Sequence, residues 1–230
     1  VGVVANTKGL ASHDLVEQGM EVLANLTHRG AAGADPTTGD GAGMLLQIPD
    51  GFFRNKVVEL GLDLPPFHDY AVGMLFLPRN DSERAICEKL VEKTVVEEGQ
   101  IFLGWRDVPV DATGIGFVAD ECRPVIRQFF VGRTASVADG ASFDRVLYVI
   151  RKVIEKDVAA ADLKEADDFY ICSLSPNVIV YKGLLTGVQL RGFYPDLTSS
   201  DLVTSFALVH SRFSTNTLGS WKLAHPYRYI

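Results

Sequence analysis

The sequence predicts an α+β fold in which antiparallel sheets pack against separate helices. Strand-like segments rich in β-branched and aromatic residues alternate with amphipathic helices, but a helix does not follow every strand. Residues 169–186 are predicted to form a hairpin, with Ser175 and Pro176 making its turn. Because a hairpin joins antiparallel strands, these observations favour layered antiparallel sheets over a doubly wound parallel sheet.

The individual strands follow from β propensity, and the helices follow from apolar residues at helical spacing. The predicted strands span residues 1–5, 43–48, 70–77, 101–105, 124–131, 168–174, 177–181 and 206–213. The predicted helices begin near Ser12 and span about residues 82–98 and 142–157. One face of the first helix consists of Leu15, Val16, Met20, Leu23 and Leu26. We therefore expect this helix, which carries Asp14 in its first turn, to pack on a sheet.

The composition is that of a globular chain with one sizeable core. The 230 residues are 47% hydrophobic and 22% charged, with a net charge of -7 and an isoelectric point near 5.2. This acidic balance provides no basic face, so neither nucleic acid nor a membrane is expected as a partner. No apolar segment is long enough to span a bilayer, and residues 1–5 lack the basic flank of a signal peptide. We expect one domain, or most of one, in the cytoplasm or an organelle.

The cysteines and histidines show no pattern of a metal site or an activated nucleophile. The cysteines lie far apart without a C-x-x-C pair, which argues against a disulfide framework and a zinc site. Cys122 follows two acidic residues that disfavour a thiolate, whereas Cys87 and Cys172 are expected to be structural residues of a helix and a strand. No metal-binding spacing connects the histidines considered, which are His13, His28, His210 and His225. Each histidine is expected to be a satisfied hydrogen-bonding residue, and no metal is predicted.

Arg212 is the strongest candidate for a ligand-binding residue. It ends an apolar run that begins at Ala207, and the hydroxyl groups of Ser214 and Thr215 follow it closely. A guanidinium group holds a carboxylate through two parallel hydrogen bonds, and adjacent hydroxyl groups add further donors. This pattern predicts a clamp for the carboxylate of a small amino acid. The alternative is a solvated arginine, or one that pairs with an internal acid such as Asp40 in a purely structural interaction module.

Two loops accompany this candidate. Residues 25–36 leave a helix through Arg29 and Gly30, where a basic residue suits the helix dipole. Residues 38–43 form a Gly-rich entry to a strand, and their spacing matches neither the dinucleotide fingerprint nor the Walker loop. For this second loop the sequence leaves two interpretations open, a tight bend that requires glycine or a wall of an active site.

Both ends of the chain lie in strand-like runs. Residues 1–5 begin without a methionine, and residues 227–230 also resemble a strand. Natural domains usually end in exposed polar segments, and edge strands with unpaired backbone groups promote aggregation. We therefore expect residues 1–230 to be a fragment of a longer domain.

Several sequence blocks closely resemble the amino-terminal glutaminase domain of glutamate synthase, a class II glutamine amidotransferase. The His-Arg-Gly block is shared widely among these amidotransferases, whereas the Tyr-Lys-Gly-Leu-Leu, Phe-Tyr-Pro-Asp-Leu and Ser-Arg-Phe-Ser-Thr-Asn-Thr blocks are typical of the glutamate synthase branch. The matching blocks are residues 1–9, 28–30, 39–43, 169–175, 180–185, 193–197 and 210–217. The resemblance therefore covers the chain from end to end.

This resemblance implies a fold and a set of binding residues. The fold is that of an N-terminal-nucleophile (Ntn) hydrolase, a four-layer αββα sandwich with antiparallel sheets, incomplete here at both ends. Arg212 would hold the α-carboxylate of L-glutamine with help from Thr215. Phe213 and Asn216 would line the pocket. The residues expected to support the loops around the nucleophile are Arg29, Gly30 and Asp40.

The same resemblance implies cysteine chemistry that residues 1–230 do not contain. An N-terminal cysteine followed by glycine is expected just before Val1, and the backbone and side-chain donors to the oxyanion are expected after Ile230. No catalytic residue is therefore assigned within the chain, and residues 1–230 alone are predicted to be inactive. The complete enzyme would release glutamate and ammonia through a cysteine thioester.

The resemblance also implies partners and cofactors outside this chain. Ammonia would pass to a synthase domain of the same polypeptide, where an oxidoreductase with FMN and an iron-sulfur cluster aminates 2-oxoglutarate. An electron-donor subunit or ferredoxin would supply electrons for this step of ammonia assimilation and glutamate biosynthesis. The expected location is the cytoplasm, or a plastid in a eukaryote. The alternative is a noncatalytic homologue that binds glutamine or serves a structural role.

Overall fold

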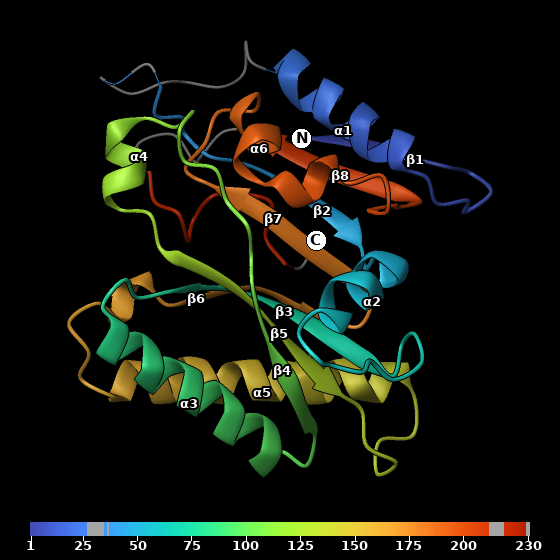
Figure 1. Cartoon of the computed structure of the whole chain (residues 1–230), viewed down its shortest axis with the longest axis vertical. Helices are drawn as coiled ribbons and strands as arrows, with labels where there is room; N and C mark the ends of the chain where they lie inside the picture. Colours follow the sequence, from blue (N-terminus) through green and yellow to red (C-terminus); the bar gives the residue numbers. More distant parts are fainter. Residues whose placement is uncertain (27–34, 36, 212–218, 229–230) are drawn as a thin grey trace. The chain divides into compact units, whose positions relative to one another are not determined.

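The computed structural model describes residues 1–26, 35, 37–211 and 219–228, which divide into two compact units. The first unit consists of Val1–Phe52, Val108–Arg123 and Val180–Ile230, and the second consists of Phe53–Asp107 and Pro124–Ile179. Each unit contains an antiparallel sheet and helices (Figure 1). The predicted mixture of helices with antiparallel sheets is therefore confirmed.

The sheet of the first unit brings the beginning of the chain next to its last strand. Its strands, in the order β1-β8-β2-β7, are β1 (Gly2–Ala5), β8 (Phe206–Ser211), β2 (Ala42–Gln47) and β7 (Val178–Gly183). Both neighbours of β8 are antiparallel to it, with Gly2 opposite Val209 and Ala42 opposite Ser211. Strands β1 and β2 therefore begin at the end of the sheet where β8 finishes.

Helix α1 (His13–Asn25) packs on this sheet, as its apolar face predicts. The helix runs along β1 and β8 (Figure 1) and buries Leu15, Val16, Met20 and Leu23. Gly19 permits the close approach, because a Cβ atom there would lie 2.9 Å from the Cε of Met44. The sequence therefore identified this helix and most of the face that it buries, whereas Leu26, which was also predicted on that face, lies just beyond the helix and is half-buried.

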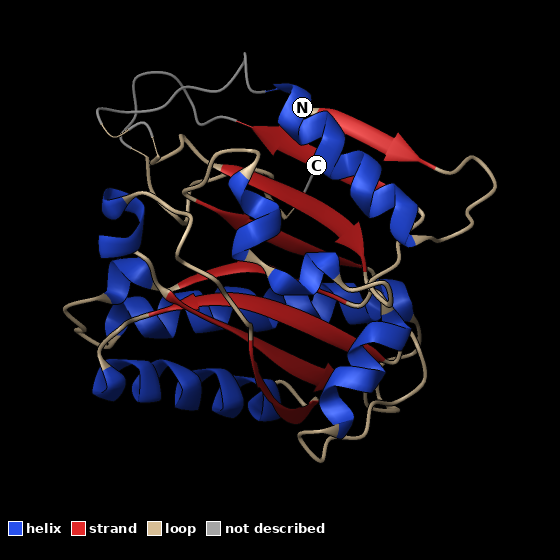
Figure 2. Cartoon of the chain, turned by 45° about the horizontal axis from the view of Figure 1, so that its top comes forward, coloured by secondary structure: helices blue, strands red, loops and turns tan. Residues whose placement is uncertain are grey.

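The sheet of the second unit supports the larger helices. Its strands, in the order β4-β5-β3-β6, are β4 (Ile101–Asp107), β5 (Val125–Gly132), β3 (Tyr70–Leu77) and β6 (Tyr170–Ser175). Helices α3 (Asp81–Glu97) and α5 (Gly140–Ala160) lie side by side on one face of this sheet (Figure 2). The core between the helices and the sheet includes Leu75, Cys87, Val91, Phe129, Phe143, Leu147, Ile150 and Ile154.

Capping side chains set the starts of these two helices. The side chain of Asn80 accepts hydrogen bonds from the backbone of Ser82 and Glu83, and that of Asp139 accepts one from Ser142. The helices therefore begin one and two residues before the predicted positions, since the capping residue fixes the first turn. Across the described parts of the chain, no helix is both long enough and apolar enough to cross a membrane.

Several short elements were not predicted from the sequence. They are α2 (Asp50–Val58), α4 (Phe117–Glu121), α6 (Gln189–Phe193) and the 3₁₀ turns Ala166–Asp168 and Pro195–Thr198. The propensity of α2 is weakened by Gly51 and Asn55, although the helix buries Phe52, Phe53 and Val57. Tertiary burial therefore stabilises this helix more than its own sequence does.

The predicted hairpin at residues 169–186 is wrong. A local turn is present, because the Oγ of Ser175 accepts hydrogen bonds from the backbone of Asn177 and Val178. However, β6 pairs with β3 in one sheet, whereas β7 lies beside β2 in the other. Both strands are buried along most of their length, which suits membership of separate sheets better than an exposed hairpin. The antiparallel prediction was therefore correct, although one argument for it was not.

Gly73 in β3 provides a test of core packing in the second unit. It lies opposite Phe129, and a Cβ atom on it would come within 1.9 Å of the Phe129 ring. Gly73→Ala should lower the free energy of unfolding by about 1–3 kcal/mol, because the strand and the ring must move apart. Denaturant unfolding measures this change. In the control Gly51→Ala, the new methyl group enters open space, and stability should stay unchanged or rise by about 0.5–1 kcal/mol. Equal effects of the two substitutions would contradict this packing.

Candidate functional site

Segments that are distant in the sequence meet at one end of the first sheet. The antiparallel pairing places Gly2 near the end of β8, and Ser211 lies opposite Ala42. The end of β7 joins them, because the backbone N–H of Gly41 donates to the carbonyl oxygen of Leu185 at 3.2 Å. We call this place, formed by Gly2, Ala42, Gly183 and Ser211, the shared end of the sheet.

The Gly-rich loop at residues 38–43 enters the shared end through a tight bend. Gly41 has a φ of 110°, a backbone conformation that favours glycine. Gly39 packs so closely against the chain that a Cβ atom would lie 2.3 Å from the backbone of Leu185 and of Thr186. The structure therefore confirms the tight-bend interpretation of this loop.

Side-chain hydrogen bonds hold the start of this loop. Asp35 accepts hydrogen bonds from the backbone of Thr37 at 2.9 Å and from the hydroxyl of Thr38 at 2.7 Å. Hydrogen bonds from Thr37 and Thr38 lower the pKa of Asp35 to about 2. The carboxylate is therefore ionised at neutral pH and acts as a fixed acceptor for the turn.

Gln189 joins the loop to two other segments of the first unit. Its Nε2 donates to the carbonyl oxygen of Thr37 at 2.7 Å and to that of Gly114 at 2.9 Å. Its Oε1 accepts from the backbone N–H of Thr186 at 2.8 Å. One side chain at the start of α6 therefore connects the Gly-rich loop with two further loops.

The segment at residues 222–227 covers the two glycines nearest the shared end. A Cβ atom on Gly41 would lie 3.2 Å from the Cβ of Ala224, and one on Gly43 would lie 2.6 Å from the carbonyl oxygen of His225. The His225 ring stacks on His210 of β8, with 4.5 Å between the ring centroids. The His225 ring also contacts the ring of Tyr227, with the centroids 4.0 Å apart. The segment therefore packs against β2 and β8 together.

Lys182 of β7 holds this segment through hydrogen bonds. Its side chain is 1% exposed, and its Nζ donates to the carbonyl oxygens of Lys222 at 2.8 Å and Ala224 at 2.7 Å. Burial, and to a smaller extent the positive charge of Lys182, lowers the pKa of His225. His225 is therefore neutral at physiological pH.

Most of the predicted binding residues lie outside the described parts of the chain. These are Arg29, Gly30, Arg212, Phe213, Ser214, Thr215 and Asn216. Asp40 is described and lies half-buried in the Gly-rich loop at the shared end. Ser211, the residue before Arg212, pairs with Ala42 of the same region. Their assigned roles therefore stay predictions, and so does the alternative pairing of Arg212 with Asp40.

Cys87, Cys172 and His13 occupy structural environments, whereas Cys122 is exposed. Cys87 and Cys172 are buried, and burial together with the charges of Glu83 and Glu88 raises the pKa of Cys87 to about 11. The ring of His13 hydrogen-bonds to the carbonyl oxygen of Leu202 and to Glu17, which confirms a satisfied hydrogen-bonding role. Within the part of the chain that the structure describes, no three His, Cys, Asp or Glu side chains form a metal-binding group.

Comparison with known proteins identifies the family to which the chain belongs. The model of the glutamine amidotransferases class-II matches residues 1–230, so the chain belongs to that family. The chain is 48% identical over 230 residues to the glutamate synthase [NADPH] large chain of Bacillus subtilis (strain 168). It is 42% identical over 232 residues to the protein of the same name from Azospirillum brasilense, and 40% identical over 230 residues to the ferredoxin-dependent glutamate synthase 2 of Synechocystis sp..

These similarities cover the whole chain but a small part of each relative. Each alignment includes 100% of the chain, which spans 14 to 15% of the length of these relatives. The resemblance predicted from the sequence blocks is therefore confirmed at the level of the family and of its glutamate synthase members.

Sequence reasoning missed the supporting contacts of Lys182 and Gln189, and for His225 it predicted a hydrogen-bonding role but not the ring stacking on His210. The sequence did carry a signal for Lys182. This lysine directly follows the apolar run at residues 178–181, and an ammonium group is costly to bury in such a strand. Two of its partners are backbone carbonyl oxygens, which have no sequence signature. The same holds for Gln189, whose acceptors lie on loops more than 70 residues away in the sequence.

Gln189→Leu should loosen the Gly-rich loop. The substitution removes the donor to the carbonyl oxygens of Thr37 and Gly114, which should cost about 1 kcal/mol of local stability because water partly replaces the lost bonds. Amide hydrogen exchange in a peptide covering residues 37–43 should therefore accelerate about fivefold. The control Gln18→Leu changes an exposed side chain of α1 and should leave this exchange unaltered. Equal exchange in both variants would contradict the role of Gln189.

The lowered pKa of His225 predicts a pH dependence of stability. The unfolded chain binds a proton more readily at this histidine than the folded protein does, since the folded pKa lies below the ordinary value of about 6.5. The neutral His225 therefore leaves the free energy of unfolding undiminished above a pH of about 6.5. Below this pH the unfolded chain takes up a proton at His225 more readily, so the free energy of unfolding falls. His225→Phe retains an aromatic ring without this titration, so unfolding free energy should decrease less between pH 7.5 and 5.5 than in the unaltered protein. An identical decrease would refute the assignment.

Proposed function

We propose that the chain is the front part of the glutamine-hydrolysing domain of a glutamate synthase. In this proposal residues 1–230 form a type 2 glutamine amidotransferase domain that continues beyond them, and the complete domain releases glutamate and ammonia from L-glutamine. The family match over the whole chain and the named relatives support this function.

The register around β8 is the structural observation that carries the proposal. Gly2 pairs with Val209 and Ala42 pairs with Ser211, so the start of β1, the Gly-rich loop and the approach to Arg212 share one end of the sheet. A residue preceding Val1 would continue β1 alongside the last residues of β8. A nucleophile there would lie near a carboxylate held by Arg212.

The proposed chemistry divides between that nucleophile and the clamp. The thiolate of a cysteine at the amino terminus attacks the amide carbon of glutamine, and its α-amino group accepts the thiol proton and delivers it to the leaving nitrogen. The C–N bond breaks to release ammonia, and water then cleaves the thioester to release glutamate. An α-amino pKa of about 7.7–8.0 suits this proton transfer near neutral pH. Oxyanion donors are expected in the continuation after Ile230.

The binding residues follow the same proposal. Arg212 holds the α-carboxylate of glutamine through its planar fork, and the hydroxyl of Thr215 adds a donor. Phe213 and Asn216 line the pocket. Arg29, Gly30 and Asp40 support the loops around the nucleophile, and the half-buried position of Asp40 in the Gly-rich loop is compatible with such a role.

The proposal extends to the fold of the complete domain. In the proposal, the two antiparallel sheets and the helices that pack on them would form part of an Ntn hydrolase αββα sandwich, and the antiparallel pairing within each sheet supports this fold. In this arrangement the sheets face each other between the helix layers.

The complete protein would couple glutamine hydrolysis to amination of 2-oxoglutarate. Ammonia would pass to a synthase domain of the same polypeptide that carries FMN and an iron-sulfur cluster. The described residues of this chain do not fit a cluster site, because they hold no group of three metal-binding side chains. The relatives are named for NADPH and for ferredoxin, so an electron-donor subunit or ferredoxin is the proposed partner, in the cytoplasm or a plastid.

Arg212→Lys in the complete protein tests the clamp. A point charge cannot reproduce the bidentate fork, so KM for glutamine should rise about tenfold or more with a smaller effect on kcat. Steady-state assay of glutamate release measures both constants. The control Arg191→Lys alters a half-exposed arginine of α6 that pairs with Glu17, and KM should not change. An unchanged KM for Arg212→Lys would remove the role assigned to this residue.

A further inference from the structure

Burial of Lys182 in β7 carries a free-energy cost of desolvation. An ammonium group that is 1% exposed loses its hydration, which destabilises the folded state unless other groups replace the water. The neighbouring strand residues Ile179, Val180 and Tyr181 are apolar or aromatic and fully buried. An apolar side chain would suit such a strand without this cost, so the lysine requires a specific explanation.

The partners of Lys182 provide that explanation. Its Nζ donates to the carbonyl oxygens of Lys222 and Ala224, and it lies 5.4 Å from the centroid of the Tyr227 ring. These acceptors belong to the segment at residues 222–227, which has no helix or strand of its own. Charge-assisted hydrogen bonds to two carbonyl oxygens and a cation–π contact therefore fix a segment that lacks a backbone ladder.

This segment packs against the shared end of the sheet and fills the space next to its glycines. Ala224 and His225 occupy the volume that side chains on Gly41 and Gly43 would fill, and His225 stacks on His210. His210 lies opposite Gly43 and only two residues before Arg212. A shift of the segment would therefore disturb the packing around the Gly-rich loop and the approach to Arg212.

We propose that Lys182 is a positioning residue for glutamine hydrolysis, because its buried ammonium group holds residues 222–227 in register across the shared end of the sheet. This inference rests on the function proposed above. Lys182 acts through this segment, which precedes the part of the complete protein where the oxyanion donors are expected. It therefore governs the geometry of the reacting groups, whereas Arg212 governs the affinity for glutamine.

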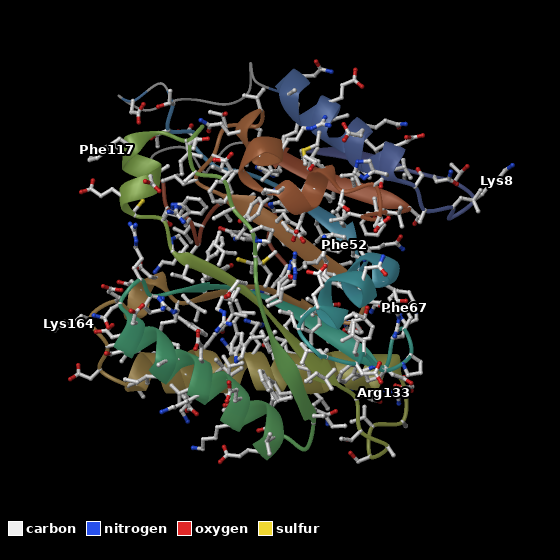
Figure 3. The ribbon with its side chains drawn as sticks, in the orientation of Figure 1. Lys8, Phe52, Phe67, Phe117, Arg133 and Lys164 are labelled. Carbon is white, nitrogen blue, oxygen red and sulfur yellow. The ribbon has the colours of Figure 1, made fainter. Side chains whose placement is uncertain are left out.

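Lys182→Met in the complete protein separates these roles. The substitution should lower kcat for glutamine hydrolysis about ten- to hundredfold, since a misplacement of about 1 Å is sufficient for such a loss, and KM should change less than about threefold. Hydrogen exchange in a peptide covering residues 221–228 should accelerate, while peptides from β3 and β5 keep their protection. The control Lys8→Met makes the same change at an exposed lysine of the loop after β1 (Figure 3) and should alter none of these values.

A second variant keeps the proposal testable if Lys182→Met does not fold. Tyr227 is 41% exposed, so Tyr227→Leu removes the ring beside the ammonium group with little effect on the core. It should lower kcat about two- to fivefold and accelerate exchange in residues 221–228. Unchanged kcat or unchanged exchange in the folded Lys182→Met variant, or in Tyr227→Leu if that variant alone folds, would overturn the proposal.

The failure of this inference is distinguishable from the failure of the proposed function. If the unaltered complete protein releases no glutamate from glutamine, the proposed function is wrong and the role of Lys182 in it also falls. If the unaltered protein is active and Lys182→Met has a normal kcat, only the role of Lys182 is refuted.

Discussion

The candidate site depends on the pairing of β8 between β1 and β2. Ala207 and Val209 are fully buried, whereas their neighbours in β8 are partly exposed. A shift of one residue would turn these apolar side chains outward, so burial fixes the register of the strand. The same register sets Ser211 opposite Ala42 and Val209 opposite Gly2, positions separated by more than 160 residues in the sequence. Core packing in the first unit thus determines which loops become neighbours.

Side-chain and backbone contacts then fix those loops. A Cβ atom on Gly39 or Gly43 would collide with neighbouring backbone, and Gly41 combines a φ of 110° with a tight contact to Ala224. Gln189 and Lys182 supply hydrogen bonds to carbonyl oxygens that no helix or sheet satisfies. The arrangement combines close packing with buried polar contacts, and its order depends on both.

The sequence predicted the elements whose signal is local. Strand β3 was predicted at its observed bounds and α1 on its observed face, because β propensity and helical periodicity lie within each segment. It did not predict the separation of β6 and β7 into two sheets, since the turn at Ser175 is compatible with either pairing and distant strands decide between them. The contacts of Lys182 were missed for the same reason, because its two carbonyl acceptors lie 40 and 42 residues further along the chain. The binding roles assigned to Arg212 and Thr215 rest on the family resemblance and stay predictions.

The amino-terminal sequence of the complete mature protein tests the central claim most directly. Intact mass and sequencing of the terminal peptide identify the residues that precede Val1. The account predicts that the mature protein begins with Cys-Gly followed by Val1, which places a thiol and its α-amino group beside the end of β8. A mature protein that begins at Val1, or with any residue other than cysteine, would contradict a glutaminase and leave at most a pocket for binding glutamine.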